Sequence, residues 1–493
     1  MLKPLSPSRW DYTTAAHLLN RAGFGGTPGE IEKLVTLGHE GAVSYLIDFE
    51  RIPDPTADPD WAKPDPTRIE KRRAARTAAP EVRQQMQKEE RQAENQRILE
   101  LRGWWLQRMA KGPRPFQEKM TLFWHGHFAT SFEKVRDSYY MWRQNELFRR
   151  LATGNWLELL TEAGKDPAML VWLDQAQSRK DHPNENFARE VMELFALGEG
   201  HYTEKDITEA ARALTGWSLD QEQQKFVWRP FIHDNGEKTV LGRTGYLNGD
   251  DFLEQIVAQP QAAIFITAKL WSFFAGEMPS TELNAELADF FRRSGNNIKP
   301  LMRVMFSTEE FYSASVIRNE IKSPVQWLIG SVRMLECELP PPLISTNLLR
   351  SLGQDIFAPP NVKGWDGGIA WITTNNLIAR YNQSALLAQG DMAVAASLAT
   401  GPNKNPAKVK QIQNRMRNMR AGGVDVVKIF TEQERNNKDL LAAALQKRLL
   451  QSTLEGSRKK ALQEFLDGKN QLDESDIRDA IRLVMSTQEY QVT

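Results

Sequence analysis

The sequence predicts a mainly α-helical protein, a bundle-like array of many helices with a few short strands or irregular loops around residues 218–250 and 354–376. Three observations favour this fold class. Apolar residues recur at helical spacing along most of the 493-residue chain, alternating strand patterns are scarce, and 41% of the residues are hydrophobic. A chain of this length is expected to form two to four domains.

Five segments follow from the changes in composition along the chain. They are an N-terminal helical segment, a Pro-rich linker with a long charged helix, a helical core with the candidate site, a second helical region with a Gly-Trp-Asp-Gly-Gly loop, and a linker with C-terminal helices. Their predicted bounds are 1–50, 51–113, 114–250, 251–399 and 400–493.

The first segment contains clear helix signals. Residues 13–22 are predicted to form a helix that ends at the glycines following Ala22. Thr27-Pro28-Gly29-Glu30 then reads as the start of a second helix, with Thr27 as N-cap and Glu30 three residues later. A third helix is expected over 41–49.

Prolines at five positions between residues 51 and 67 predict a linker. Residues 68–100 carry nine Lys or Arg and six Asp or Glu, which predicts one long solvated helix supported by i,i+4 pairs. Residues 114–217 and 251–335 are predicted to be helical. The polar, Asn-rich stretch 400–424 reads as a linker, and helices resume after it.

The charge balance limits the classes of partner. Lys plus Arg equal Asp plus Glu at 63 each, which argues against a dedicated nucleic-acid binder. The single cysteine, Cys337, excludes an intrachain disulfide and a thiolate metal cluster. The sequence has no apolar run of about 18 residues that would predict a membrane span. It has no secretory leader pattern, so we expect a soluble, cytoplasmic protein as written, with export of a processed form left open.

Five of the seven histidines fall between residues 125 and 233, and the first two form a His125-Gly126-His127 motif. Pro115 is predicted to begin a helix that Gly126 ends. Imidazoles two residues apart around a glycine can converge on one zinc or iron ion. The alternative is that each ring simply meets the negative end of the helix dipole.

A second group of polar residues lies on one helix. Asn186, Glu190 and Glu193 would lie within about 60° of one another, so that the two carboxylates hold a metal or share a proton. The alternative is the solvent face of an amphipathic helix. His201 follows at a glycine-flanked turn, before a helix that Thr203 is predicted to cap.

Two loops complete the candidate region. His233-Asp234 is a pair that can supply metal ligands, or an acid/base with its orienting group. In the stretch 359–368, glycines near Lys363 and Asp366 could form an anion-binding nest. The stretch lacks the spacing of a phosphate-binding loop and is interpreted as a structural loop that lines the site with Trp365 and Trp371.

Several motifs in order resemble the large bacterial family catalogued as domain of unknown function 1800. The resemblance spans roughly residues 10–390 and the last helix. It implies a bacterial protein whose genes neighbour those of an often exported family related to sulfatases and alkaline phosphatases; it implies no particular reaction. The motifs are His17 to Gly25, Phe123 to Phe128, Asn186 to Leu197, Ala211 to Trp217, His233 to Gly242 and Asn361 to Trp365.

The leading hypothesis is a metal-binding protein, possibly a metal-dependent enzyme acting on a small molecule or polymer, with hydrolysis favoured over redox chemistry. The cofactor would be a divalent transition metal, zinc or iron. Glu190 and His201 are the predicted catalytic residues. The predicted metal ligands are His125, His127, Glu193, His233 and Asp234.

Two other hypotheses stay open. The first is a non-catalytic helical scaffold that binds a protein partner, such as the neighbouring sulfatase- or phosphatase-like protein. The second and weaker one is binding of a polyanion or glycan through Arg and Trp surfaces. None of the three involves nucleic acid or a membrane.

Overall fold

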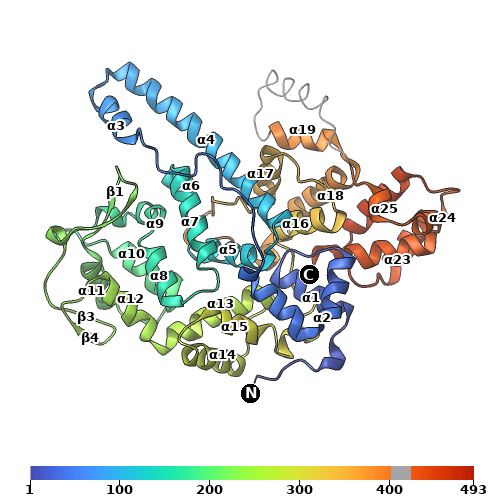
Figure 1. Cartoon of the computed structure of the whole chain (residues 1–493), viewed down its shortest axis with the longest axis horizontal. Helices are drawn as coiled ribbons and strands as arrows, with labels where there is room; N and C mark the ends of the chain where they lie inside the picture. Colours follow the sequence, from blue (N-terminus) through green and yellow to red (C-terminus); the bar gives the residue numbers. More distant parts are fainter. Residues whose placement is uncertain (1, 401–422) are drawn as a thin grey trace.

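The computed structural model describes residues 2–400 and 423–493, and helices dominate it, as predicted (Figure 1). Helix α1 (Tyr12–Ala22) and helix α2 (Pro28–Ile47) both begin with capping boxes, at Asp11 and at Thr27. The helix predicted over 41–49 is the second half of α2. Gly38 separates the halves with φ 69°, a conformation that glycine adopts without strain.

The charged segment is two helices rather than the single one predicted. Helix α3 (Arg68–Thr77) ends before Pro80, which begins helix α4 (Pro80–Lys111). Proline has no N–H to continue a helix and favours an extended residue before it, and Ala79 has ψ 152°. The two helices form an arm that projects from the rest of the molecule (Figure 1).

The middle of the chain folds into short helices. Helix α5 (Pro115–His127) begins at proline as predicted, but Gly126 lies inside it and does not end it, because Phe128 N–H still donates to Trp124 O. The helices after it are α6 (Phe132–Val135), α7 (Ser138–Arg150), α8 (Trp156–Gly164), α9 (Pro167–Trp172), α10 (Glu185–Glu190), a π-helix (Val191–Ala196) and α11 (Glu204–Leu214).

Two small antiparallel sheets occupy the predicted irregular region. Strand β1 (Trp217–Asp220) pairs with β2 (Lys225–Trp228), and β3 (Lys238–Val240) pairs with β4 (Arg243–Gly245). The predicted loop at 354–376 is also present. It contains one 3-10 turn, Gly368–Trp371, before α18 begins.

The remaining helices complete the array. They are α12 (Gly249–Ala258), α13 (Pro260–Ala275), α14 (Thr281–Arg293), α15 (Ile298–Met305), α16 (Pro324–Leu335), α17 (Pro342–Ser351), α18 (Thr374–Gln389), α19 (Met392–Thr400), α21 (Val426–Ile429), α22 (Glu432–Asn436), α23 (Lys438–Leu449), α24 (Gly456–Asp467) and α25 (Glu474–Met485). The linker predicted at 400–424 lies, for residues 401–422, outside the described residues.

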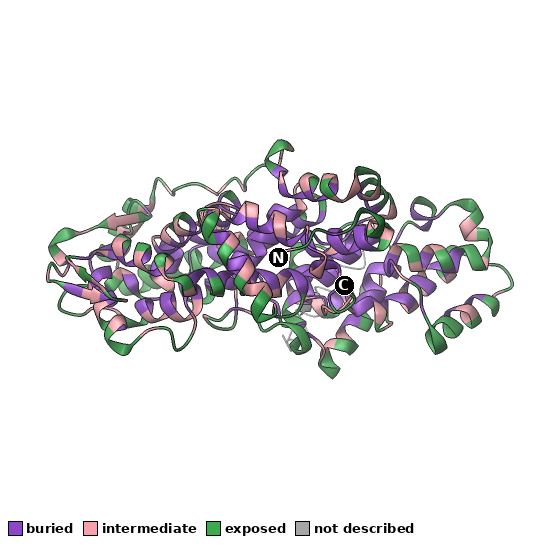
Figure 2. Ribbon diagram, turned by 90° about the horizontal axis from the view of Figure 1, so that it is seen from below, coloured by how far each residue is buried: buried purple, intermediate pink, exposed green. Residues whose placement is uncertain are grey.

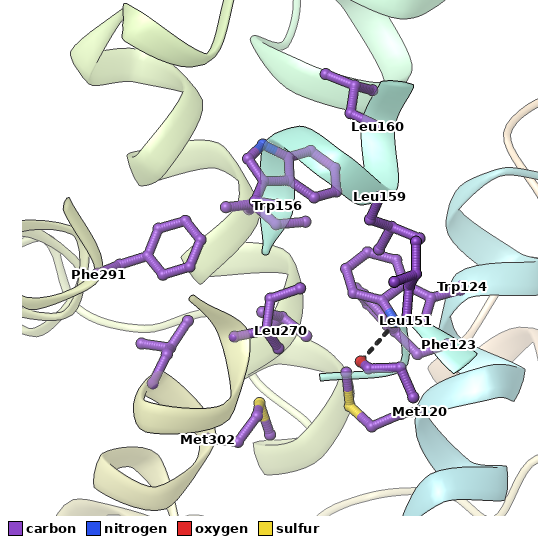
Figure 3. Packing of buried hydrophobic residues seen from close by; sticks show 14 of the residues in the cluster. Met120, Phe123, Trp124, Leu151, Trp156, Leu159, Leu160, Leu270, Phe291 and Met302 are labelled. Carbon is purple, nitrogen blue, oxygen red and sulfur yellow. Dashed lines mark hydrogen bonds between the residues drawn. The ribbon is translucent and has the colours of Figure 1, made fainter. Parts of the chain in front are cut away.

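Buried apolar side chains form two large clusters. The first runs from Leu5 to Val316 and includes Trp124, Trp156 and Leu270, which meet from separate helices (Figure 3). The second joins the base of α4 to the C-terminal helices, through residues such as Trp105 and Trp327. Both clusters draw on several of the five predicted segments. Buried residues fill the middle of the molecule, whereas exposed ones dominate its rim (Figure 2).

None of the helices within residues 2–400 and 423–493 has both the length and the apolar character that crossing a lipid bilayer requires.

Candidate functional site

A helical hairpin carries two of the predicted site residues, Glu190 and Glu193. Its first arm is α10, continued by the π-helix, and its second arm is α11. Arg189 donates two hydrogen bonds to Glu204, at 2.9 and 2.8 Å, and Thr208 donates to Glu185 at 3.2 Å. The first pair of bonds joins the end of α10 to the start of α11, and the third joins the start of α10 to the next turn of α11, so the two helices lie antiparallel.

The two carboxylates have different surroundings. Glu190 is half-buried, and burial raises its pKa; the negative charge of Glu193 adds to the rise, while Lys363 and Arg189 oppose it. Glu193 accepts a hydrogen bond from the Tyr202 hydroxyl at 2.9 Å. Burial and this carboxylate raise the pKa of Tyr202 to about 12, so the phenol keeps its proton.

Glu193 lies within the π-helix, a rare conformation that often occurs at functional sites. Leu197 N–H donates to Met192 O at 2.8 Å, a span of five residues. The last carbonyls of a helix lack partners within it, and here side chains supply them. Lys269 donates to Leu194 O at 3.2 Å, and His127 donates to Phe195 O at 2.9 Å.

A loop distant in sequence reaches the same place. Gly364 has φ 89°, and a Cβ added there would lie 2.4 Å from Gly126 O, so the loop rests directly on the end of α5. This position brings the Lys363 ammonium close enough to Glu190 to oppose the rise in its pKa. Segments around His127, Glu190 and Lys363 therefore meet at one site.

His127 and His125 face different parts of the protein. A carbonyl only accepts, so His127 Nε2 carries the proton; its Nδ1 is buried, with no hydrogen-bond partner in the described part of the chain. His125 Nε2 lies 3.0 Å from the Asn145 amide nitrogen. It must accept, because the Asn145 amide oxygen already accepts from Arg149 at 2.6 Å.

Both imidazoles are neutral. Burial, with Arg149, lowers the pKa of His125 to about 3, and burial, with Lys269, holds the pKa of His127 well below its usual value. Residues two apart in a helix point roughly 200° apart. His125 contacts Trp105 and Phe148, whereas His127 contacts Phe195. The structure thus does not bring the two rings to one point.

His201 is exposed in the turn immediately before Tyr202, next to the carboxylate pair in sequence. His233 and Asp234 lie elsewhere. His233 Nδ1 donates to Thr215 O at 2.7 Å, and Asp234 accepts from Arg212 at 2.7 Å, a bond that lowers the pKa of the Asp234 carboxyl. Arg212 lies about 12 Å along α11 from Glu204. The bond between Arg212 and Asp234 therefore holds the His233–Asp234 loop at the end of α11 that is distant from Glu204.

The fit of these residues to a metal ion is limited. Within residues 2–400 and 423–493 no group of three or more His, Cys, Asp or Glu side chains is placed to hold one. The Nε2 atoms of His125 and His127 are engaged with protein groups. Glu190 and Glu193 remain as a pair of oxygen donors, the type of donor that hard cations prefer.

Sequence reasoning missed three cationic or hydroxyl partners of the site: Lys363, Lys269 and Tyr202. Burial lowers the pKa of Lys269 to about 8. Two weak signals existed. Tyr202 adjoins the predicted turn residue His201, and Lys363 lies in the loop predicted to line the site.

This fold and this site define a mainly helical protein with a paired-carboxylate centre on a helical hairpin. The chain belongs to the family described as "Protein of unknown function (DUF1800)", whose profile matches residues 17–492. This match confirms the resemblance found in the motifs. No curated protein and no solved structure matches the chain.

Proposed function

We propose that the chain is an enzyme of the hydrolase type whose proton-transfer centre is Glu190 with Glu193. One observation carries the proposal: three motifs of the family resemblance, far apart in sequence, meet around these carboxylates. They are Phe123 to Phe128, Asn186 to Leu197 and Asn361 to Trp365.

The two carboxylates suit different roles because their surroundings differ. The raised pKa of Glu190 favours its protonated form, which can donate to a leaving oxygen as its bond to the substrate breaks. Glu193, oriented by Tyr202, accepts the proton of a water whose oxygen forms the new bond. Lys363 stabilises negative charge that develops beside the pair.

The test is a panel of chromogenic esters, phosphate esters and glycosides assayed with the full chain between pH 4 and 9. Removing a general acid costs about 10²–10⁴-fold in rate, so Glu190→Gln should abolish most activity and the alkaline limb of its pH profile. Glu185→Gln is the matched control on the same helix. Equal rates for both variants, or no turnover of any substrate, would contradict the proposal.

The metal-dependent form of this proposal uses the same carboxylates. Glu190 and Glu193 would bind a divalent cation, which would polarise the substrate or lower the pKa of water. The donors favour a hard cation over the zinc or iron expected from the histidines. Elemental analysis after dialysis tests this form. Equal metal content in the wild type and in a Glu190→Gln/Glu193→Gln variant would contradict the metal-dependent form but not the acid–base form of the proposal.

The second candidate function is a scaffold that binds a protein partner. The projecting α3–α4 arm favours it, together with a cleft of about 660 Å³ between the arm and the body. Its lining includes the apolar residues Met86, Val135 and Leu219, and about half of its lining residues are charged. The test compares which proteins encoded by neighbouring genes are captured by the wild type and by a chain lacking residues 68–91. Identical capture would argue against partner binding by the arm.

A further inference from the structure

Helix α7 presents one continuous stripe of large polar and aromatic side chains to a second cleft, of about 440 Å³. The stripe follows the spacing i, i+3, i+4, i+7 and i+11, which places its members on one face of the helix. These members are Tyr139, Trp142, Arg143, Glu146 and Arg150. From Tyr139 to Arg150 the stripe extends about 16 Å, long enough for several units of an extended ligand.

One end of this cleft is aromatic. The rings of Tyr139 and Trp142 are nearly parallel, with centroids 5.8 Å apart and an interplanar angle of 23°. Phe226 of β2 also lines the cleft. The cleft therefore offers a ligand three aromatic side chains.

The rest of the cleft both donates and accepts hydrogen bonds. Three cations, Arg143, Arg150 and Lys165, line it together with three carboxyl groups, Glu146, Glu162 and Asp166. Arg143 also donates to Gln224 O, and Glu146 also accepts from Arg149. This balance of charges disfavours a nucleic acid, which needs an excess of positive charge. It also disfavours a polyproline segment, because proline residues have no N–H to offer the carboxylates.

A sugar ring matches all of these features. Its C–H face packs on an aromatic ring, and its hydroxyls both donate to carboxylates and accept from guanidinium groups. We propose that this cleft binds an oligosaccharide, with one sugar stacked on Trp142 and Tyr139 and its hydroxyls bonded to Arg143 and Glu146. The cleft is separate from the carboxylate pair, so the proposal stands independently of the hydrolase.

Calorimetric titration of the full chain tests it, with cellohexaose, laminarihexaose, chitohexaose and hexagalacturonate as probes and decaproline as the competing class. We expect at least one oligosaccharide to bind. Trp142→Ala should then weaken binding about tenfold or more, the loss of roughly 1.4 kcal/mol of stacking, while Trp142→Phe keeps most of it. Comparing the affinities of the neutral probes with that of hexagalacturonate shows whether Arg150 favours an acidic oligosaccharide.

Tyr246→Ala, which removes an exposed ring outside the cleft, is the matched control and should bind as the wild type does. If Trp142→Ala fails to fold by circular dichroism, Tyr139→Ala replaces it. The proposal is overturned if no oligosaccharide binds at millimolar concentration, if binding survives the loss of both rings, or if only decaproline binds. Glu190→Gln should leave binding unchanged, which separates this result from that of the hydrolase assay.

Discussion

At the scale of single residues, the most consequential group outside the two sites is the Glu118 carboxylate, which is only 2% exposed. It accepts from Arg149 at 2.7 Å, from Arg108 at 3.0 Å and from the Trp105 indole at 2.9 Å. Burial alone would raise its pKa, but the two guanidinium groups lower it below the usual value. Arg149 also orients Asn145, which in turn holds His125.

Glu118→Gln should therefore be strongly destabilising, because it leaves two buried cations without a full counter-charge. Breaking a buried ion pair costs about 3–5 kcal/mol, which urea unfolding measures directly. Exposed Glu222→Gln is the control, with an expected change within about 0.5 kcal/mol. A Glu118→Gln variant as stable as this control would show that the network contributes nothing.

Sequence reasoning succeeded for local features of single residues and failed for distant ones. The capping boxes at Thr27 and Thr203 were predictable because both partners lie within three residues. The Glu118 network joins residues up to 31 positions apart, and its charged members read as solvent-facing in isolation. The clustering of the histidines in sequence predicted one shared site, but spacing along the chain does not reveal which partner occupies each imidazole nitrogen.

At the scale of elements, the arm differs from the helices that form the core. Helix α3 has no buried residue, and α4 buries side chains only from Glu94 onward. Helix α5, by contrast, buries nearly all of its residues. Helices without tertiary packing are marginal in water, so the outer arm depends on local ion pairs such as Lys71–Asp65.

Amide hydrogen exchange should reflect this difference. The amides of α3 and of α4 before Glu94 are expected to exchange through local opening, at least about 100-fold faster than those of α5, which need wider unfolding. Mass spectrometry of peptides from the two regions measures it, and raising the salt concentration should accelerate the arm further by weakening its ion pairs. Equal protection of the arm and α5 would mean that something covers the arm.

The type and order of the elements were largely predictable from periodicity, whereas the breaks within and between helices were not. The charge pattern predicted one continuous helix, but Pro80 divides the segment into α3 and α4. The π-helix was not foreseen, since its wider turn has no composition of its own and depends on Lys269 and His127 to satisfy its last carbonyls. The site was found only in part because Lys363 arrives from a loop about 170 residues further along the chain.

At the scale of the whole molecule, a buried lysine lies in the chain between Val316 of the first apolar cluster and Val325 of the second. Lys322 is 6% exposed, and its ammonium lies 4.0 Å from the centre of the Tyr490 ring. Burial, with the positive charges of Arg318 and Arg380, lowers the pKa of Lys322 to about 7. The folded protein therefore releases this proton at a lower pH than the unfolded chain.

The cost of burying this charge is fully present below about pH 7, and it disappears as the pH rises toward 10.5, the ordinary value for lysine. Lys322→Met should stabilise the fold at pH 6, on the order of 2 kcal/mol, and the gain should shrink by pH 10. Urea midpoints at pH 6, 8 and 10 measure the effect, with exposed Lys459→Met as control. A gain that is constant across this range would contradict the expected titration.

The contact between Gly364 and Gly126 sets how closely the loop that carries Lys363 approaches α5. A Cβ at Gly364 would lie 2.4 Å from the Gly126 carbonyl oxygen, so a side chain at this position would push the loop away from the helix. The position of Lys363 relative to Glu190 thus depends on main-chain atoms, whose dimensions do not change when side chains elsewhere are substituted. Glycine at position 364 therefore keeps the loop against the helix, and with it the place from which Lys363 acts on Glu190.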